Sequence, residues 1–382
     1  MKPILSAMLS VSGLTLTDNE KYMLEESNPI GVTIFKRNIS NWDQVAALTQ
    51  SIKTVIGRDN VLIAVDQEGG CTSRFEPPLT DRIFVSQYSI GSLSLDECKR
   101  MAELQAQLIS QDLLRAGVNL NYSPCLDIRY DITAPVLRNR CFSEDKHIVA
   151  ECGKIMIETY KGNGIIPCMK HLPGHGRVVV DPHFLLPALN ETVDELADDF
   201  YPFQQNATIC PMGMTAHILI PNVDEKWPVT QSKKGIQQLI RDKIGYDGFL
   251  ISDGIEMRAL NGSLYENTKY ALEAGCDAVC FCRGTETGMR EVIDASHPLT
   301  DKAYERLERC FAVLRNTCQY TSTYSAQKYE ELRTKIKQST GDYDAVEVLN
   351  KENQTNVILT SKKKIITQEM KTFEPEFENC KC

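Results

Sequence analysis

The chain has 382 residues, 42% of them hydrophobic, which is enough for a large buried core. Its 42 Lys and Arg residues against 51 Asp and Glu give a formal net charge of −9, which argues against nucleic acid as a partner. The apolar runs are too short to span a membrane, and residues 4–11 are expected to form a buried strand rather than part of a signal peptide.

Short apolar runs alternate with periodic, charged segments along the chain. The expected strands cover residues 3–11, 30–35, 61–66, 118–128, 164–171, 210–218, 248–253 and 277–282. Amphipathic helices are expected over 12–26, 41–56, 95–117, 145–163 and 192–206. Eight strand and helix units within about 320 residues predict an α/β fold, a (β/α)8 barrel of the triosephosphate isomerase type. No GxGxxG motif follows a strand, so no dinucleotide cofactor is expected.

The region after residue 321 has a different composition. It is polar, rich in Lys and Glu, and lacks another barrel unit. We therefore expect a barrel domain over residues 1–321 and a C-terminal extension over 322–382, which is either mobile or holds a surface helix near 326–337 and a short strand near 356–360.

The cysteines do not predict a disulfide framework. Many of the fourteen lie within apolar runs such as "SPCLDI" and "IIPCMKH", where a thiol serves as a small hydrophobic group. A reducing cytoplasm is the simpler setting. The close pairs Cys280/Cys282 and Cys380/Cys382 are spaced as CxC and are not a strong zinc signal.

Ionisable residues end five of the expected strands. These residues are Asp66 and Glu68, Asp127, Lys170 and His171, His217, and Asp253. A single strand often becomes polar as it leaves the core, but the C-terminal ends of parallel barrel strands share one face, where active sites form. The pattern predicts one pocket at this face.

The stretch "KHLPGHGRVVVDPHFLLP", residues 170–187, holds three of the six histidines. A metal site would use His171, His175, Asp181 and His183, but Pro173 and Pro182 interrupt the regular spacing, so no metal is expected. The prolines also disfavour a phosphate-binding helix N-terminus. An acid–base pair remains, in which Asp181 orients His183, although a solvated loop histidine is the simpler explanation for that residue alone.

A partner for this pair lies in "GFLISDGIEM". Asp253 follows the seventh expected strand and is either a helix N-cap or an ionised carboxylate in the pocket. An aspartate and a protonated histidine facing each other can act as the nucleophile and the acid of a retaining glycosidase.

Five motifs together resemble family 3 glycoside hydrolases of the bacterial β-N-acetylglucosaminidase branch. They are "VLIAVDQEGGCTSRF", "SPCLDI", "NRCFSED", "KHLPGHGRVVVDPH" and "GFLISDGIEM", in the family's order over residues 1 to about 320. The resemblance implies Asp253 as nucleophile and His183 with Asp181 as acid/base dyad. It also implies that the sugar is held by Asp66, Arg74, Arg140, Lys170 and His171.

The resemblance implies a cytoplasmic, exo-acting retaining enzyme that releases GlcNAc from cell-wall muropeptides, as a monomer or weak oligomer without a cofactor. Three residues depart from the family pattern. They are Cys71 where arginine is usual, Arg138 where glycine is common, and Pro182 where serine is usual. Two alternatives stay open: a phosphorylase, in which phosphate resolves the glycosyl-enzyme, and a non-catalytic sugar-binding barrel. A β-glucosidase fits less well.

Overall fold

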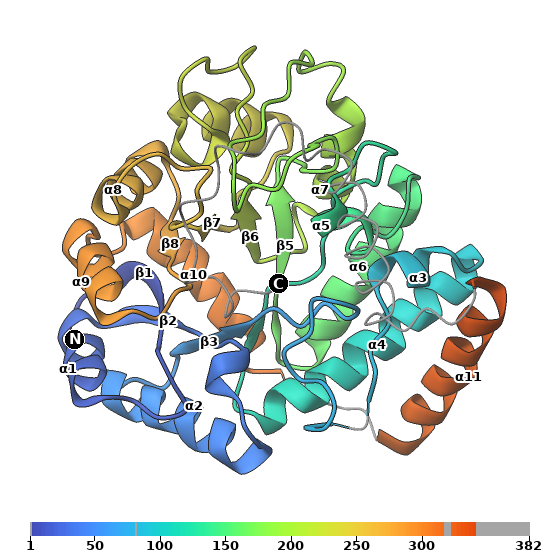
Figure 1. Ribbon diagram of the computed structural model, residues 1–382, viewed down its shortest axis with the longest axis horizontal. Helices are drawn as coiled ribbons and strands as arrows, with labels where there is room; N and C mark the ends of the chain where they lie inside the picture. The colour runs from blue at the N-terminus through green and yellow to red at the C-terminus, as the bar shows by residue number, and fades with distance from the viewer. Residues whose placement is uncertain (1, 81, 317–321, 341–382) are drawn as a thin grey trace, which may run out of the picture.

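The fold was analysed in a computed structural model that describes residues 2–80, 82–316 and 322–340, with side chains of the last helix described for 325–336. Eight parallel strands form a closed barrel in which each strand pairs with the next and β8 pairs with β1 (Figure 1). The predicted (β/α)8 fold is confirmed. The strands are β1 Leu5–Ser10, β2 Pro29–Thr33, β3 Leu62–Val65, β4 Leu120–Asn121, β5 Ile166–Leu172, β6 Met212–Thr215, β7 Phe249–Gly254 and β8 Ala278–Cys280.

Helices surround the barrel (Figure 1). They are α1 Asp18–Ser27, α2 Trp42–Ile56, α3 Gln87–Gly91, α4 Leu95–Arg115, α5 Pro135–Arg138, α6 Lys146–Gly162, α7 Ala197–Asn206, α8 Leu264–Ala274, α9 Glu286–Ala295, α10 Asp301–Val313 and α11 Ser322–Thr340. Two 3-10 turns, η1 Lys36–Asn38 and η2 Val229–Gln231, and a π-helix, η3 Gly235–Lys243, complete the described elements. No helix among the described residues is both long and apolar enough to cross a bilayer.

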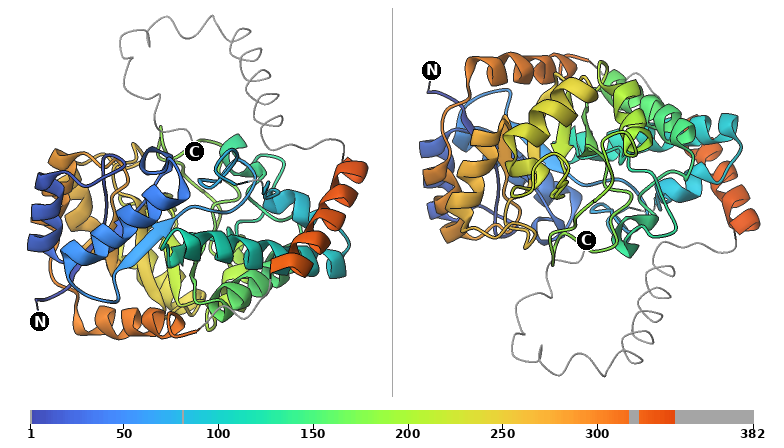
Figure 2. Two further views of the ribbon diagram at one scale, coloured as in Figure 1. Left: turned by 90° about the horizontal axis from the view of Figure 1, so that it is seen from below. Right: turned by 90° about the horizontal axis from the view of Figure 1, so that it is seen from above.

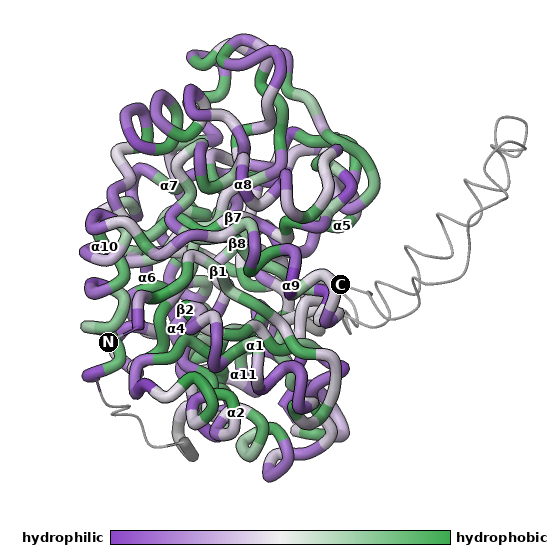
Figure 3. The backbone as a smooth tube through the Cα atoms, turned by 90° about the vertical axis from the view of Figure 1, so that its left-hand side faces the viewer, coloured by the Kyte–Doolittle hydropathy of each residue, from purple (hydrophilic) through white to green (hydrophobic). Residues whose placement is uncertain are grey.

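Alternation along each strand separates two cores. Met8 on β1 points into the barrel with residues such as Ile166 and Phe249, whereas its neighbours Ala7 and Leu9 pack outward against the helices. Leu307 and Phe311 of α10 belong to the inner core, so α10 closes one end of the barrel (Figure 2). Apolar segments accordingly gather along the strands, while polar and apolar stretches alternate along the outer helices (Figure 3).

Several expected elements are shorter than predicted. The helix expected over 12–26 begins at Asp18, after the Thr17 N-cap. β4 is confined to Leu120–Asn121 within the expected 118–128, because the chain then reaches Pro124, which cannot donate a ladder hydrogen bond. The helix expected over 192–206 begins at Ala197, since Thr192 and Glu195 first close a separate turn in which the Thr192 amide donates to Glu195 Oε2 at 2.7 Å. α11 confirms the expected surface helix, and the expected strand near 356–360 and Cys380/Cys382 lie outside the described residues.

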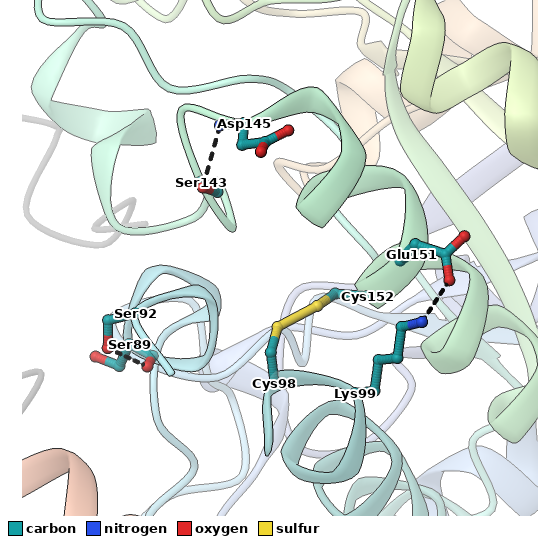
Figure 4. The surroundings of a disulfide bond; sticks show 8 residues. All are labelled: Ser89, Ser92, Cys98, Lys99, Ser143, Asp145, Glu151 and Cys152. Carbon is teal, nitrogen blue, oxygen red and sulfur yellow. Dashed lines mark hydrogen bonds and ion pairs between the residues drawn. A yellow bond between two sulfur atoms is a disulfide. The ribbon is translucent and has the colours of Figure 1, made fainter. Parts of the chain in front are cut away.

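A disulfide joins two helices that the sequence did not link. Cys98 on α4 is bonded to Cys152 on α6, with the Lys99–Glu151 ion pair (2.8 Å) beside it (Figure 4). The view of the cysteines as small hydrophobic groups is wrong for this pair, because pairing depends on which helix faces meet. Nine further cysteines in the described part of the chain are free, and most of them are buried as expected.

Candidate active site

A cluster of charged side chains occupies the C-terminal ends of β3 and β5. Lys170 Nζ, on β5, lies 2.8 Å from Asp66 Oδ1 and 2.5 Å from Glu68 Oε1, two residues of the segment that follows β3. Arg140 binds the same Glu68 with two hydrogen bonds, at 2.8 and 3.0 Å. Arg74 Nη2 lies 3.4 Å from Asp66 Oδ2. These contacts bring four of the predicted sugar-binding residues together.

The charges in this cluster hold one another ionised. Burial by itself raises the pKa of Asp66, but Lys170 and Arg74 outweigh it and hold that pKa well below its ordinary value. Burial alone lowers the pKa of Lys170, whereas Asp66 and Glu68 raise it above the ordinary value. Lys170 is only 1% exposed, while the Asp66 side chain remains 18% exposed. The cluster therefore presents a fixed carboxylate to the barrel mouth, backed by cations.

His171 is oriented from behind by a buried carboxylate. Its Nδ1 donates to Asp127 Oδ2 at 2.7 Å, since an ionised carboxylate can only accept. Nε2 then faces Arg140, whose Nη2 lies 3.3 Å away. Burial raises the pKa of Asp127, but the opposing effect of His171 and His175 is larger, so the pKa lies well below its ordinary value. Asp127 therefore fixes both the tautomer and the direction of the His171 ring.

His175 organises the loop that follows β5. Its backbone N–H donates to Asp127 Oδ1 at 2.6 Å, and its side chain is 3% exposed. Burial, with the neighbouring His171, lowers the pKa of His175 to about 3, so the ring is neutral. A Cβ on Gly176 would lie 1.8 Å from the Ile128 carbonyl oxygen, so only glycine allows this close approach.

The predicted dyad forms on the next part of this loop. His183 Nδ1 lies 2.7 Å from Asp181 Oδ1, and the His183 backbone N–H donates to the same oxygen at 2.9 Å. Burial raises the pKa of Asp181, but hydrogen bonds from His183 lower it below the ordinary value. The His183 side chain is 39% exposed and the Asp181 side chain 27%, so both can be reached by a substrate. The imidazole thus has an ionised carboxylate on Nδ1, which favours its protonated form.

A backbone contact fastens this loop to the segment after β7. The Pro182 carbonyl accepts a hydrogen bond from Ala259 N at 3.1 Å. Asp253, in β7, accepts from Gly254 N at 2.7 Å through Oδ1. The charge of His183, 70 positions earlier in the sequence, also lowers the pKa of Asp253.

Asp253 is held ionised. Burial raises its pKa, but His171, His217 and the Gly254 N–H together bring it below the ordinary value. His217 is itself fixed, with Nε2 3.0 Å from the Gly254 carbonyl and Nδ1 2.8 Å from Thr230 Oγ1. Asp253 is therefore an ionised carboxylate near the C-terminal end of β7.

Glu256, three residues further on, is a partly buried glutamate whose Oε2 is enclosed by the protein. Its Oε1 accepts from Cys282 N at 2.9 Å, while Oε2 has no partner among the described residues. Burial raises its pKa from 4.5 to about 7. Because the folded-state pKa is raised, stability is greatest below about pH 4.5 and is lost as the pH rises toward 7, at a cost on the order of 3 kcal/mol.

We expect Glu256→Gln to remove this loss. The amide keeps an acceptor for Cys282 N but cannot ionise, so the variant should gain up to about 3 kcal/mol over wild type between pH 5 and pH 8. Urea unfolding at both pH values measures this difference. Glu225→Gln, at an exposed carboxyl, is the control. Equal pH dependence in wild type and Glu256→Gln would contradict the assignment.

The four residues that were considered and rejected as a metal site fall into two separate pairs. His171 and His175 lie side by side, with ring centroids 5.5 Å apart, but Asp181 and His183 form their own pair on the loop. Within the described residues, a different group could supply metal ligands, namely Cys125, Asp127 and His171, whose ligand atoms lie within 4.8 Å of one another. Hydrogen bonds from Cys125 Sγ and His171 Nδ1 to Asp127 Oδ2 account for their proximity.

The three departures lie around the site without displacing a predicted residue. Cys71 is half-buried, and burial raises the pKa of its thiol, which keeps it protonated. Arg138 donates from Nε to the Thr133 carbonyl at 2.7 Å and so braces its own loop. Pro182 supplies the carbonyl that binds Ala259 N.

Sequence reasoning assigned no role to three residues that the site uses. Glu68 bridges Lys170 and Arg140, Asp127 orients His171, and His217 lies beside Asp253. All three are among the ionisable residues that end the expected strands. That position was a signal for the site, but their partners lie on other strands and cannot be read from the local sequence.

The sequence was compared with known protein families and proteins. The chain matches the glycosyl hydrolase family 3 N-terminal domain over residues 5–310. It is 33% identical over 313 residues to a β-hexosaminidase of Chromobacterium violaceum, covering 79% of this chain and 85% of that protein. The β-hexosaminidase of Bordetella avium is 34% identical over 283 residues, covering 72% and 79%.

Solved structures agree with the sequence relatives. NagZ from Neisseria gonorrhoeae, in complex with N-trifluoroacetyl-D-glucosamine, aligns with a TM-score of 0.76 and 26% identity over 86% of this chain and 97% of that one. A family 3 β-N-acetylglucosaminidase from Paenibacillus sp. strain FPU-7 gives 0.75 and 25%, and the alignment covers 86% of this chain and 66% of that longer one. The chain therefore belongs to glycosyl hydrolase family 3 and is a glycoside hydrolase.

Proposed function

We propose that the protein is an exo-acting, retaining β-N-acetylglucosaminidase. The observation that carries this proposal is the meeting at one barrel mouth of an ionised Asp253, the Asp181–His183 dyad and the Asp66–Lys170 pair. The names of the relatives support the substrate, since they are β-hexosaminidases and a β-N-acetylglucosaminidase.

In the first step, the Asp253 carboxylate attacks the anomeric carbon as the bond to the leaving oxygen breaks. His183 Nε2 donates its proton to that oxygen, and the Asp181 carboxylate stabilises the charge on the ring. In the second step, the neutral His183 takes a proton from water, whose oxygen displaces Asp253. Two displacements at one carbon retain the β configuration.

The charged cluster is proposed to hold the terminal sugar. Asp66 accepts hydrogen bonds from sugar hydroxyls, and Lys170, Arg74 and Arg140 supply charge-assisted donors. Arg74 Nη1 is buried without a partner among the described residues and so has a hydrogen bond to give. His171, with Nδ1 held by Asp127 and Nε2 3.3 Å from Arg140 Nη2, lies beside these donors.

The natural substrate is proposed to be a GlcNAc-containing muropeptide, cleaved in the cytoplasm. Nine free cysteines in the described part of the chain agree with a reducing compartment, whereas the Cys98–Cys152 bond is more usual in an oxidising one. Residues 1–321 are proposed as the catalytic domain, with 322–382 as an extension.

Two aryl substrates test the reaction class. We expect release of the aryl group from aryl β-N-acetylglucosaminide, and little or none from aryl β-glucoside. Turnover of the glucoside at a comparable rate, or of neither sugar by folded protein, would contradict the proposal, the latter in favour of a sugar-binding barrel.

Phosphate distinguishes hydrolysis from phosphorolysis. A histidine acid/base places less negative charge near an incoming anion than a glutamate would, which makes phosphate a chemically reasonable acceptor. Asp181, ionised beside His183, restores part of that charge. We expect free GlcNAc as the product at every phosphate concentration. Accumulation of GlcNAc-1-phosphate in proportion to added phosphate would instead establish the phosphorylase.

A further inference from the structure

The last described helix, α11, lies outside the residues that match the family domain, yet it packs on the catalytic barrel. It lies along α4, beside α3 (Figures 1 and 2). Tyr329, Leu332 and Ile336 face inward, and Tyr329 is 2% exposed. A purely structural helix needs only such apolar contacts, but Tyr329 brings a hydroxyl into the interface.

That hydroxyl is engaged on both sides. It accepts a hydrogen bond from Val85 N at 3.0 Å and donates to Gln105 Oε1 at 2.9 Å, with the Ile83 carbonyl 3.2 Å away. The Tyr329 ring also meets the Phe84 ring edge to face, with centroids 6.1 Å apart. Tyr329 therefore binds both α4, through Gln105, and the segment 83–85 that precedes α3.

Gln105 passes this contact on to the segment after β3. Its Nε2 donates to the Glu68 carbonyl at 3.1 Å and to the Val85 carbonyl at 3.0 Å. The fit is tight, since a Cβ on Gly69, whose φ is +104°, would lie 2.6 Å from that Nε2. Every polar atom of the Gln105 side chain is thus used to join Tyr329 to the main chain at Glu68.

Glu68 completes the path, because its carboxylate binds Lys170 Nζ and Arg140 in the charged cluster. We propose that Tyr329 is a positioning residue for sugar binding, acting through Gln105 and the main chain of Glu68 on Lys170 and Arg140. The inference rests on the sugar-binding role proposed for that cluster. It gives α11 a function in sugar binding without contact with substrate.

The variant Tyr329→Phe isolates the hydroxyl, because the ring and its packing remain. Val85 N and Gln105 Oε1 then lose a buried partner, and Glu68 loses a restraint. We expect the Kd for GlcNAc, measured by calorimetry, and the KM for aryl β-N-acetylglucosaminide to rise about fivefold, with kcat changing less than twofold.

Ser325→Ala is the matched control on the same helix. Ser325 Oγ also donates to a buried glutamine on α4, Gln107 Oε1, at 3.0 Å, but Gln107 Nε2 continues to Glu103 and not to the β3 segment. Both variants should therefore lower the Tm by similar amounts. Only Tyr329→Phe should weaken GlcNAc binding, a difference that a merely structural role of α11 does not produce.

A second variant approaches the path from α4. Gln105→Met fills a similar volume without the amide, so it should raise the GlcNAc Kd as Tyr329→Phe does, and the double variant should add little. An unchanged GlcNAc Kd in Tyr329→Phe would overturn the inference, and so would an equal rise of that Kd in Ser325→Ala. If Tyr329→Phe does not fold, an unchanged Kd in Gln105→Met would overturn it. Turnover by the wild type tests the proposed function separately, because binding is measured without it.

Discussion

Replacing Asp253 by Ala or Asn is expected to lower kcat by about 10⁴-fold or more, with the fold intact. The carboxylate is held ionised by His171, His217 and the Gly254 N–H, which is the state a nucleophile requires. Asn keeps the acceptor for Gly254 N but cannot form the glycosyl ester. Steady-state rates on aryl β-N-acetylglucosaminide and thermal unfolding measure both effects.

Added azide tests whether Asp253 is the nucleophile. In Asp253→Ala, a small anion can occupy the space of the lost carboxylate and attack the same face of the sugar, so azide should restore turnover and give the α-glycosyl azide. Asp224→Ala, at a carboxylate that only organises the turn before η2, is the control and should keep full activity. If Asp253→Ala retains most of the wild-type activity, or forms the β-glycosyl azide, the nucleophile is a different residue.

His183→Ala should show an effect that depends on the leaving group. For a leaving group of high pKa, loss of the proton donor is expected to lower kcat/KM by about 10³-fold. A dinitrophenyl leaving group departs without protonation, so with this substrate the variant should retain most of the wild-type rate of the first step. Asp181→Asn leaves the imidazole ring in place but removes its charged partner at 2.7 Å. It should therefore lower kcat/KM less than His183→Ala does. Rates across a series of aryl leaving groups measure this dependence.

His297→Ala provides the comparison, since the His297 side chain is exposed and its Nδ1 donates to the neighbouring Pro298 carbonyl. It should leave every rate unchanged. If the loss in His183→Ala is the same for good and poor leaving groups, His183 serves binding or loop closure and not proton transfer.

The sequence alone predicted the barrel, the order of its strands and helices, and the ends of strands at which chemistry occurs. Those properties are local, because hydrophobic periodicity distinguishes strands from helices and a polar residue at the end of an apolar run marks the barrel mouth. Lys170, His171 and Asp253 could be found in this way, and the dyad could be found because its two members are two residues apart.

What only the tertiary structure decided is which distant side chains meet. Glu68 joins Lys170 and Arg140, Asp127 turns His171, Cys98 is bonded to Cys152, and Tyr329 reaches the main chain of Glu68 through Gln105. Each contact crosses between elements that a single sequence does not align with one another. Register and packing angles place these atoms within hydrogen-bonding or bonding distance, and they depend on the whole folded core, which local patterns do not describe.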